Sequence, residues 1–101
     1  MIPIEIPFRA DMREAIIAGN KYCTSRSKKY GRPGDTFKIG AKTYVLTAVL
    51  RRSLGTVASM YYEAEGTDSP DAFRSLWAEI HPRKGFDPCQ MVWVHHFREV
   101  L

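Results

Sequence analysis

The sequence predicts a single α+β domain, residues 1–101, in which a small closed or curled β-sheet packs against helices. Its length is that of one domain, since domains typically have about 100–150 residues. The predicted elements follow the order β-α-β-β-β-α-α-β, which suits one sheet with helices packed against it. The last predicted strand, residues 89–100, is apolar on both faces near its middle. We therefore expect that strand to be covered on both sides.

The N-terminal third is predicted to contain an edge strand, a helix and the start of a second strand. Residues 2–8 alternate apolar side chains with two prolines and a glutamate, which is the period of a half-buried strand. Because proline cannot donate to a β-ladder, this strand is expected at a sheet edge. Residues 10–20 have one apolar face at helical spacing and reach a left-handed stop at Gly19. Residues 21–27 begin a strand, and a glycine- and proline-containing loop, residues 27–35, follows.

The rest of the chain predicts a hairpin and two helices before the last strand. Residues 35–40 and 42–53 form strands joined by a tight turn, and the second is mostly β-branched, aromatic or aliphatic, as central strands are. Residues 55–66 are predicted to be helical. A second helix, residues 69–82, begins with Ser69 as its cap and a proline in its first turn. The apolar stripe of this helix, expected to be buried, consists of Phe73, Leu76, Trp77 and Ile80.

Charge is distributed unevenly along the chain. Residues 21–52, which we call the basic band, hold nine basic residues and one acidic residue, a net charge of +8. Residues 53–80 hold five acidic residues and one basic residue, a net charge of −4. A basic face beside an acidic one suits an anionic ligand or a polynucleotide. A solvated charged surface explains the same pattern equally well.

The sequence gives no reason to expect a metal, a cofactor or a membrane partner. Cys23 and Cys89 lack the spacing of a metal site, and two cysteines define no disulfide framework. His95 and His96 are adjacent in a predicted strand, so they face opposite sides and cannot bind one metal together. Charged residues interrupt every apolar run, which argues against a signal peptide or a membrane span. We expect a cytoplasmic monomer.

Four ordered segments resemble the ASCH domain, a member of the PUA-like superfamily. They read AIIAGNKYCTSR, GDTFKIG, YYEAEGTDSPDAFRSLWAEIHP and VWVHHF. The resemblance covers nearly the whole chain, and its most specific parts are the corner at residues 18–26, the turn at residues 34–37 and the helix pair at residues 65–82. It implies a small β-barrel of five or six mixed strands, with two or three helices packed at its rim.

The resemblance also implies an activity and a set of residues. ASCH domains are associated with RNA binding, coactivator roles and RNA modification. A group of similar size contains bacterial N4-acetylcytidine amidohydrolases, which carry a lysine, a threonine three residues later and a glutamate before the second helix. On this sequence the resemblance implies Lys21 as proton acceptor, Thr24 as nucleophile and Glu65 as proton donor. Glu63 lies two residues from Glu65, and either carboxylate fits the alignment.

The residues themselves are compatible with acyl transfer. In a regular strand Thr24 and Arg26 share a face, whereas Lys21 joins them only if it lies in the turn before the strand. A threonine hydroxyl is a poor nucleophile unless a base takes its proton. A lysine serves as that base only when its pKa falls by about three toward neutrality, which burial or nearby positive charge can cause. Alternatively, Lys21 and Arg26 bind phosphate while Thr24 packs, or the thiol of Cys23 is the nucleophile.

The remaining candidate site residues are those expected to bind substrate or phosphate: Arg26, Lys28, Lys29, Tyr30 and Glu63. The leading hypothesis is hydrolysis of an N-acylated pyrimidine nucleoside such as N4-acetylcytidine, with a modified nucleoside or RNA as partner. The alternatives are a non-catalytic RNA-binding module, whose basic band follows the phosphates, and an ASCH-type ribonuclease. The three catalytic candidates are expected at the rim, where substitutions change stability by less than about 0.5 kcal/mol.

Overall fold

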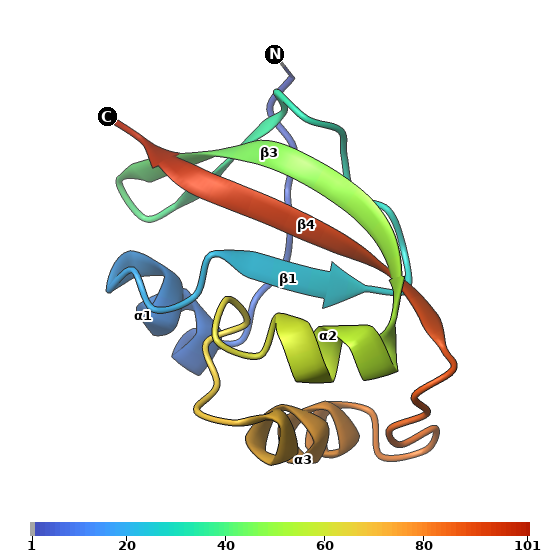
Figure 1. Cartoon of the computed structure of the whole chain (residues 1–101). Helices are drawn as coiled ribbons and strands as arrows, with labels where there is room; N and C mark the ends of the chain where they lie inside the picture. Colours follow the sequence, from blue (N-terminus) through green and yellow to red (C-terminus); the bar gives the residue numbers. More distant parts are fainter. Residues whose placement is uncertain (1) are drawn as a thin grey trace.

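A computed structural model describes residues 2–101 as a four-stranded antiparallel sheet with three helices (Figure 1). The strands are β1 (Cys23–Arg26), β2 (Thr36–Ile39), β3 (Lys42–Ser53) and β4 (Met91–Val100). They lie in the order β1-β4-β3-β2, so β3 is an interior strand, as predicted. The helices are α1 (Ala10–Ile17), α2 (Leu54–Met60) and α3 (Pro70–Ile80). The α+β class is confirmed.

The long pair β3 and β4 curls across the molecule (Figure 1). Leu46 pairs with Phe97 and Ala48 pairs with His96, so the register skips Thr47. An extra residue of this kind is a β-bulge, which bends its strand and increases the local twist. The sequence predicted a closed or curled sheet, and this bulge contributes part of the curvature.

The predicted strand at residues 2–8 is wrong, apart from one isolated bridge. Pro3 lies parallel to Thr36, and the Ile4 N–H donates to the Thr36 carbonyl at 2.7 Å. Pro3 and Pro7 have no N–H to donate, so this segment cannot extend a regular ladder. As a result, the described residues form four strands instead of five or six. Their pairings are all antiparallel instead of mixed.

Of the two predicted C-terminal helices, one is confirmed and the other is too long. Ser69 caps α3 by accepting a hydrogen bond from the Ala72 N–H at 3.0 Å, and a proline follows in the first turn. The helix predicted over residues 55–66 ends at Met60, and residues 61–67 fold mainly as turns. These turns position the candidate site described below.

Two apolar clusters cover the two faces of the sheet. In β4, Val92 and Val94 pack with α2 and α3 on one face, whereas Phe97 packs with α1 and β2 residues on the other. Alternate side chains of a strand point to opposite faces, so this arrangement confirms that β4 is covered on both sides. Within residues 2–101, no helix has the length and apolar character needed to span a membrane.

Candidate active site

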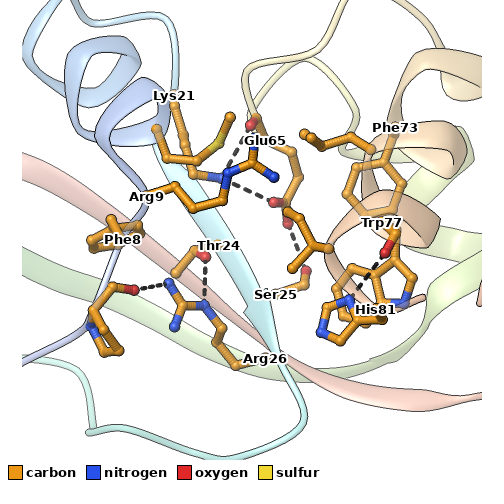
Figure 2. A pocket seen from close by; sticks show the side chains of 14 residues that line it. Phe8, Arg9, Lys21, Thr24, Ser25, Arg26, Glu65, Phe73, Trp77 and His81 are labelled. Carbon is orange, nitrogen blue, oxygen red and sulfur yellow. Dashed lines mark hydrogen bonds and ion pairs between the residues drawn. The ribbon is translucent and has the colours of Figure 1, made fainter. Parts of the chain in front are cut away.

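A pocket of about 200 Å³ lies between the N-terminal segment, β1 and α3 (Figure 2). One wall is polar and contains Lys21, Thr24, Ser25, Arg26 and Glu65. The opposite wall belongs to α3 and contains Phe73, Leu76, Trp77 and Ile80. The latter four are the stripe that the sequence predicted to be buried. Phe73 and Trp77 are buried, but Ile80 is 40% exposed, so the stripe serves both the core and the pocket.

The end of α1 determines where Lys21 lies. Gly19 has a φ of 85°, a left-handed conformation that glycine adopts without strain. After it, the N–H groups of Asn20 and Lys21 both donate to the Ala15 carbonyl, at 2.9 and 3.1 Å. The chain therefore wraps around the helix end, and Lys21 precedes the first residue of β1. The alternation of a strand does not apply to it, and its side chain reaches the same pocket as Thr24.

The turn at residues 61–67 determines where Glu65 lies. The N–H groups of the two residues after Lys21 both donate to the Ala64 carbonyl, at 2.8 and 3.0 Å. These bonds attach the turn to the start of β1. Gly66 follows with a φ of 90°, and a Cβ atom there would lie 3.1 Å from the Cβ of Lys21. The close approach of the two segments brings Glu65 against Lys21.

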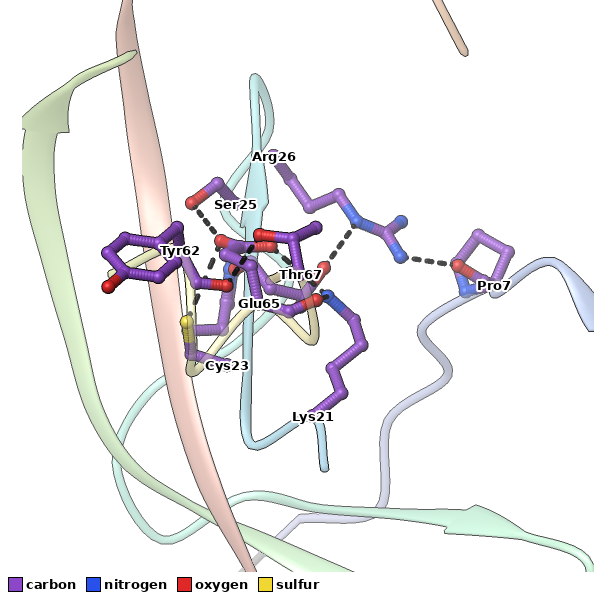
Figure 3. A network of polar contacts seen from close by, with 10 residues as sticks. Pro7, Lys21, Cys23, Ser25, Arg26, Tyr62, Glu65 and Thr67 are labelled. Carbon is purple, nitrogen blue, oxygen red and sulfur yellow. Dashed lines mark hydrogen bonds and ion pairs between the residues drawn. The ribbon is translucent and has the colours of Figure 1, made fainter. Parts of the chain in front are cut away.

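Lys21 and Glu65 form a buried ion pair within a larger polar network (Figure 3). The Nζ of Lys21 donates to the Glu65 carbonyl at 3.0 Å and to its Oε1 at 3.1 Å. The Oε2 of Glu65 accepts from the Ser25 hydroxyl at 2.6 Å and from the Cys23 thiol at 3.6 Å. The two charged side chains are only 4% and 5% exposed. Each carboxylate oxygen therefore has a donor, and the lysine uses two of its three protons on Glu65.

Arg26 is bonded to the hydroxyl of Thr24. Its Nε donates to the Thr24 Oγ1 at 3.1 Å, and its Nη2 donates to the Pro7 carbonyl at 2.5 Å. The guanidinium carbon also lies 4.9 Å from the ring centre of Phe8 and 5.4 Å from that of Tyr30. Burial lowers the pKa of Arg26 below its ordinary value, but arginine remains protonated in proteins. The site thus holds a fixed positive charge beside a hydroxyl oxygen.

The two histidines of β4 have separate surroundings, as the strand alternation predicts. The Nε2 of His95 accepts from the Tyr30 N–H at 3.0 Å. Its Nδ1 therefore carries the proton and donates to the Thr24 carbonyl at 3.2 Å. Burial lowers the pKa of His95, which keeps the ring neutral at neutral pH. His96 instead packs edge-on against Tyr61.

Cys23 is fully buried, and that burial decides its chemistry. Desolvation is the main cause that raises the pKa of its thiol, and the neighbouring Glu65 raises it further. The thiol therefore keeps its proton and donates it toward Glu65. A thiolate nucleophile at this position is disfavoured.

Four of the predicted site residues lie outside the pocket lining. Lys28 and Lys29 are exposed, and their Nζ atoms lie 5.2 Å from the Tyr30 ring centre and 5.1 Å from the Trp93 ring centre, respectively. Tyr30 contacts Arg26 and His95 but does not line the pocket. Glu63 is exposed on the turn that carries the buried glutamate. Of the two carboxylates left open by the alignment, only Glu65 meets Lys21.

The expectation of an exposed rim is wrong for all three catalytic candidates. Lys21, Thr24 and Glu65 are each only 4% exposed. Lys21 packs against Gly66 of the turn at residues 61–67, and Thr24 lies on β1 beside Arg26, which bonds to the N-terminal segment at Pro7. Substitutions here consequently remove buried polar contacts, whose loss affects stability more than a surface change does.

Sequence reasoning missed Ser25 and the paired rings of Trp77 and His81. Of the hydrogen bonds that Glu65 accepts, the one from Ser25 is the shortest. The sequence pointed to Ser25 only in that the short strand β1 has a polar residue on each of its faces. The His81 ring stacks on Trp77 with centres 4.2 Å apart, and its Nδ1 lies 3.1 Å from the Trp77 carbonyl. Both rings line the pocket. An apolar stripe has the same sequence pattern whether it faces a core or a cavity, so no signal could have identified them.

The residue types gathered in this pocket are compatible with acyl transfer. A hydroxyl, a lysine amine and a carboxylate line one pocket, and a guanidinium contacts the hydroxyl oxygen. Nucleophile, base, acid and charge stabiliser are the parts that such a reaction needs. Among residues 2–101 no three histidine, cysteine or acidic side chains gather as metal ligands do.

Comparison with known proteins identifies the fold. No family model and no curated protein matches the sequence. The ASCH domain from Lactobacillus crispatus JV V101 is similar in structure, with a TM-score of 0.68 and 12% identity over 95% of this chain and 76% of that one. Protein EF3133 from Enterococcus faecalis V583, of family DUF984, has a TM-score of 0.62 and 19% identity over 89% and 70% of the two chains. The hypothetical protein PH0355 has a TM-score of 0.60 and 18% identity over 92% and 94%. At these identities the likeness defines the architecture: this chain has the fold of an ASCH domain.

Proposed function

We propose that the protein is an amidohydrolase that removes the acyl group from an N-acylated pyrimidine nucleoside such as N4-acetylcytidine. The observation that carries the proposal is the shared pocket of Lys21, Thr24 and Glu65, in which the amine and the carboxylate are 3.1 Å apart. Two groups within hydrogen-bond reach can exchange a proton, and a base must be this close to the proton that it moves. The fold of an ASCH domain is compatible with this activity.

The first half of the reaction forms an ester on Thr24. A proton passes from Lys21 to Glu65 across their contact, which leaves a neutral amine and a carboxylic acid. The hydroxyl oxygen of Thr24 then attacks the acyl carbon while its proton moves to the Lys21 amine. As the C–O bond forms and the C–N bond breaks, the departing amine of the cytosine ring takes the proton of Glu65. The ion pair is restored, and unmodified nucleoside leaves.

The second half returns Thr24 to its hydroxyl form. Water attacks the acyl carbon of the ester, and the proton that it loses passes to the Lys21–Glu65 pair. The same pair returns one proton to the Thr24 oxygen as the ester bond breaks. The products are a carboxylic acid and the starting enzyme, so the whole cycle consumes one water and one amide.

The pocket supports a substrate that is enclosed only in part. Its volume of about 200 Å³ is below the about 300–1,000 Å³ of typical small-molecule pockets. A planar base with a short acyl group suits such a volume, and we expect the sugar to remain at the mouth. Trp77 and Phe73 provide an apolar wall on which a base can pack.

The test is release of cytidine from N4-acetylcytidine by the purified protein, followed by chromatography. We expect activity in the wild type and in Thr24→Ser, which keeps a hydroxyl, and none in Thr24→Ala. Glu65→Gln removes the acid and should reduce kcat by about 10²–10⁴-fold. Glu63→Gln, a change of the same kind on the exposed part of the same turn, is the matched control. Activity that survives in Thr24→Ala, or its absence from the wild type, would refute the proposal.

A second candidate function, polynucleotide binding, is favoured by the surroundings of Trp93. The Nζ of Lys29 and the guanidinium of Arg51 both lie over its ring, 5.1 and 4.9 Å from the centre. Trp93 pairs with Arg26 on one neighbouring strand and with Arg51 on the other, so these side chains share a face of the sheet. An aromatic ring among cations suits a stacked base with flanking phosphates.

This binding is tested with a labelled single-stranded RNA at several salt concentrations. Each phosphate contact should add about 0.7 to the slope of log affinity against log salt. W93A should weaken binding through lost stacking, whereas K84Q, at an exposed lysine in the loop after α3, should change it little. Intact RNA with salt-dependent binding supports a binding module, and shortened RNA supports a ribonuclease. Absence of binding at low salt would exclude both.

A further inference from the structure

Arg26 contacts the reactive oxygen of the proposed nucleophile. We propose that Arg26 is a catalytic residue: its Nε–H holds the Thr24 hydroxyl in one orientation and stabilises the oxygen as its proton leaves. The sequence predicts Arg26 as a substrate- or phosphate-binding residue, and the bond to Thr24 adds this role at the nucleophile. The inference rests on the proposed function in that Thr24 is taken as the nucleophile. It is carried by the 3.1 Å bond from Arg26 to the Thr24 Oγ1.

One bidentate edge of the guanidinium, formed by Nε and Nη2, is already engaged. Bidentate recognition of a phosphate uses two parallel N–H groups of arginine. In this structure Nε donates to Thr24 and Nη2 donates to the Pro7 carbonyl. Phe8 and Tyr30 contact the planar group in addition. Arg26 is thus fixed against Thr24 by the fold, before any ligand binds.

The hydrogen bonds available to a hydroxyl explain how this contact orients the nucleophile. The Thr24 oxygen has one proton and two lone pairs. One lone pair accepts the Arg26 Nε–H, so the other remains for attack on a carbonyl carbon. In the proposed reaction the proton moves to the amine of Lys21, which lines the same pocket. A cation within about 4–6 Å typically lowers the pKa of an acidic group by about 1–3, and here the contact is closer.

Other charged groups near Thr24 must be held constant in any test. Arg9, Lys21, Glu65 and His81 line the same pocket, and His95 bonds to the Thr24 carbonyl. A comparison between variants that differ only at Arg26 keeps all of these groups.

Arg9 is the matched control for a nearby charge without contact. It lines the pocket, but its guanidinium bonds to Asp11 at 3.1 Å and to Glu79 at 3.4 Å. Its removal changes the positive charge near the pocket by the same amount as removal of Arg26. If R26Q has a larger effect than R9Q, the excess comes from the direct bond to Thr24 and not from the loss of a nearby positive charge.

The first experiment replaces the hydroxyl with a group whose proton can be titrated. T24C is made in a C89S background, and the ultraviolet absorbance of the thiolate is followed against pH. The thiol of Cys23 is fully buried and its pKa is raised, so it stays silent. We expect the pKa of the introduced thiol to lie about 1–3 pH units below the ordinary cysteine pKa of about 8.5. R26Q should raise that pKa by at least about 1, and R9Q should raise it less. Equal pKa values with and without the Arg26 guanidinium would overturn the inference.

The second experiment uses the enzyme reaction with N4-acetylcytidine. R26Q should reduce kcat by about 10²–10³-fold, the usual loss when one charge-stabilising donor is removed, while KM changes little. R26K keeps a charge without the Nε–H and should be intermediate. A raised KM with unchanged kcat would show substrate binding instead and would overturn the inference.

Melting temperatures identify any variant that fails to fold, and R26K then replaces R26Q in both experiments. The outcomes separate the two proposals. If the wild type releases no cytidine, the proposed function fails, but the thiol titration still decides the role of Arg26. If the wild type is active and R26Q keeps both kcat and the thiol pKa, only the inference about Arg26 fails.

Discussion

Replacing Lys21 with methionine tests what the buried ion pair contributes to stability. K21M keeps a long unbranched side chain and removes the ammonium group. The Glu65 carboxylate, 5% exposed, then loses the cation that faces it and retains only the donors Ser25 and Cys23. Removing one partner of a buried ion pair typically costs about 3–5 kcal/mol. We expect the free energy of unfolding to fall by about that amount. This is a large part of the total free energy of unfolding of a typical domain, which is about 5–15 kcal/mol.

A second lysine provides the matched control. The Nζ of Lys42 contacts a backbone carbonyl, that of Ile17, at 3.3 Å and the carboxylate of Glu99 at 3.5 Å. Lys21 has the same two kinds of partner, a carbonyl and a carboxylate. The difference is burial, because the side chains of Lys42 and Glu99 are 41% and 35% exposed. Water screens such a pair, so K42M should cost less than about 1 kcal/mol.

Urea unfolding followed by circular dichroism measures both changes, with the slope checked for constancy. The double variant K21M/E65L removes both charges and should recover most of the loss, since apolar replacements of a buried pair are often neutral or stabilising. If K21M costs no more than K42M, the argument that burial decides the effect is refuted. If K21M/E65L is no more stable than K21M, the loss does not come from an unpaired charge.

Two further predictions concern stability. Burial lowers the pKa of His95 from its ordinary 6.5, so below about that pH the unfolded chain binds a proton that the folded chain does not. Stability should therefore be full above this pH and fall as the pH decreases below it, and a melting temperature that stays constant below this pH would contradict this. G66A should cost more than about 1 kcal/mol, because Gly66 has a φ of 90° and a Cβ atom there would meet Lys21 at 3.1 Å. G19A is its control, because Gly19 has a φ of 85° and a Cβ atom there would have no neighbour within 4 Å. If urea unfolding shows the same loss of stability for both variants, the contact with Lys21 has no effect.

Elements with local signals could be predicted from the sequence, and those set by distant contacts could not. The cap at Ser69 and the left-handed stop at Gly19 are read from a few neighbouring residues, and both are confirmed. The helix over residues 55–66 was predicted too long because its composition favours a helix. It ends at Met60, and the turn that follows is attached through the Ala64 carbonyl to the start of β1, far earlier in the chain. Such a long-range bond leaves no trace in the local pattern.

The candidate site shows the same division. Strand alternation placed Thr24 and Arg26 on one face, and they are bonded there. The pairing of Lys21 with Glu65 spans 44 residues, and only the family resemblance brought them together in advance. Lys28 was assigned to ligand binding by its charge alone. Charge indicates what a residue can bind but not where its side chain lies, and this residue lies outside the pocket.

The composition of the pocket walls bears on why two charged side chains are buried here. Apolar side chains of similar volume would give this position comparable or greater stability, because desolvation of two charges offsets most of their attraction. The opposite wall, which contains Phe73 and Trp77, shows that this fold can supply such side chains at the same depth. Stability therefore does not explain why Lys21 and Glu65 lie beside the pocket. The proton transfer that we propose would explain it, since it requires an acid and a base in contact with each other and close to a nucleophile.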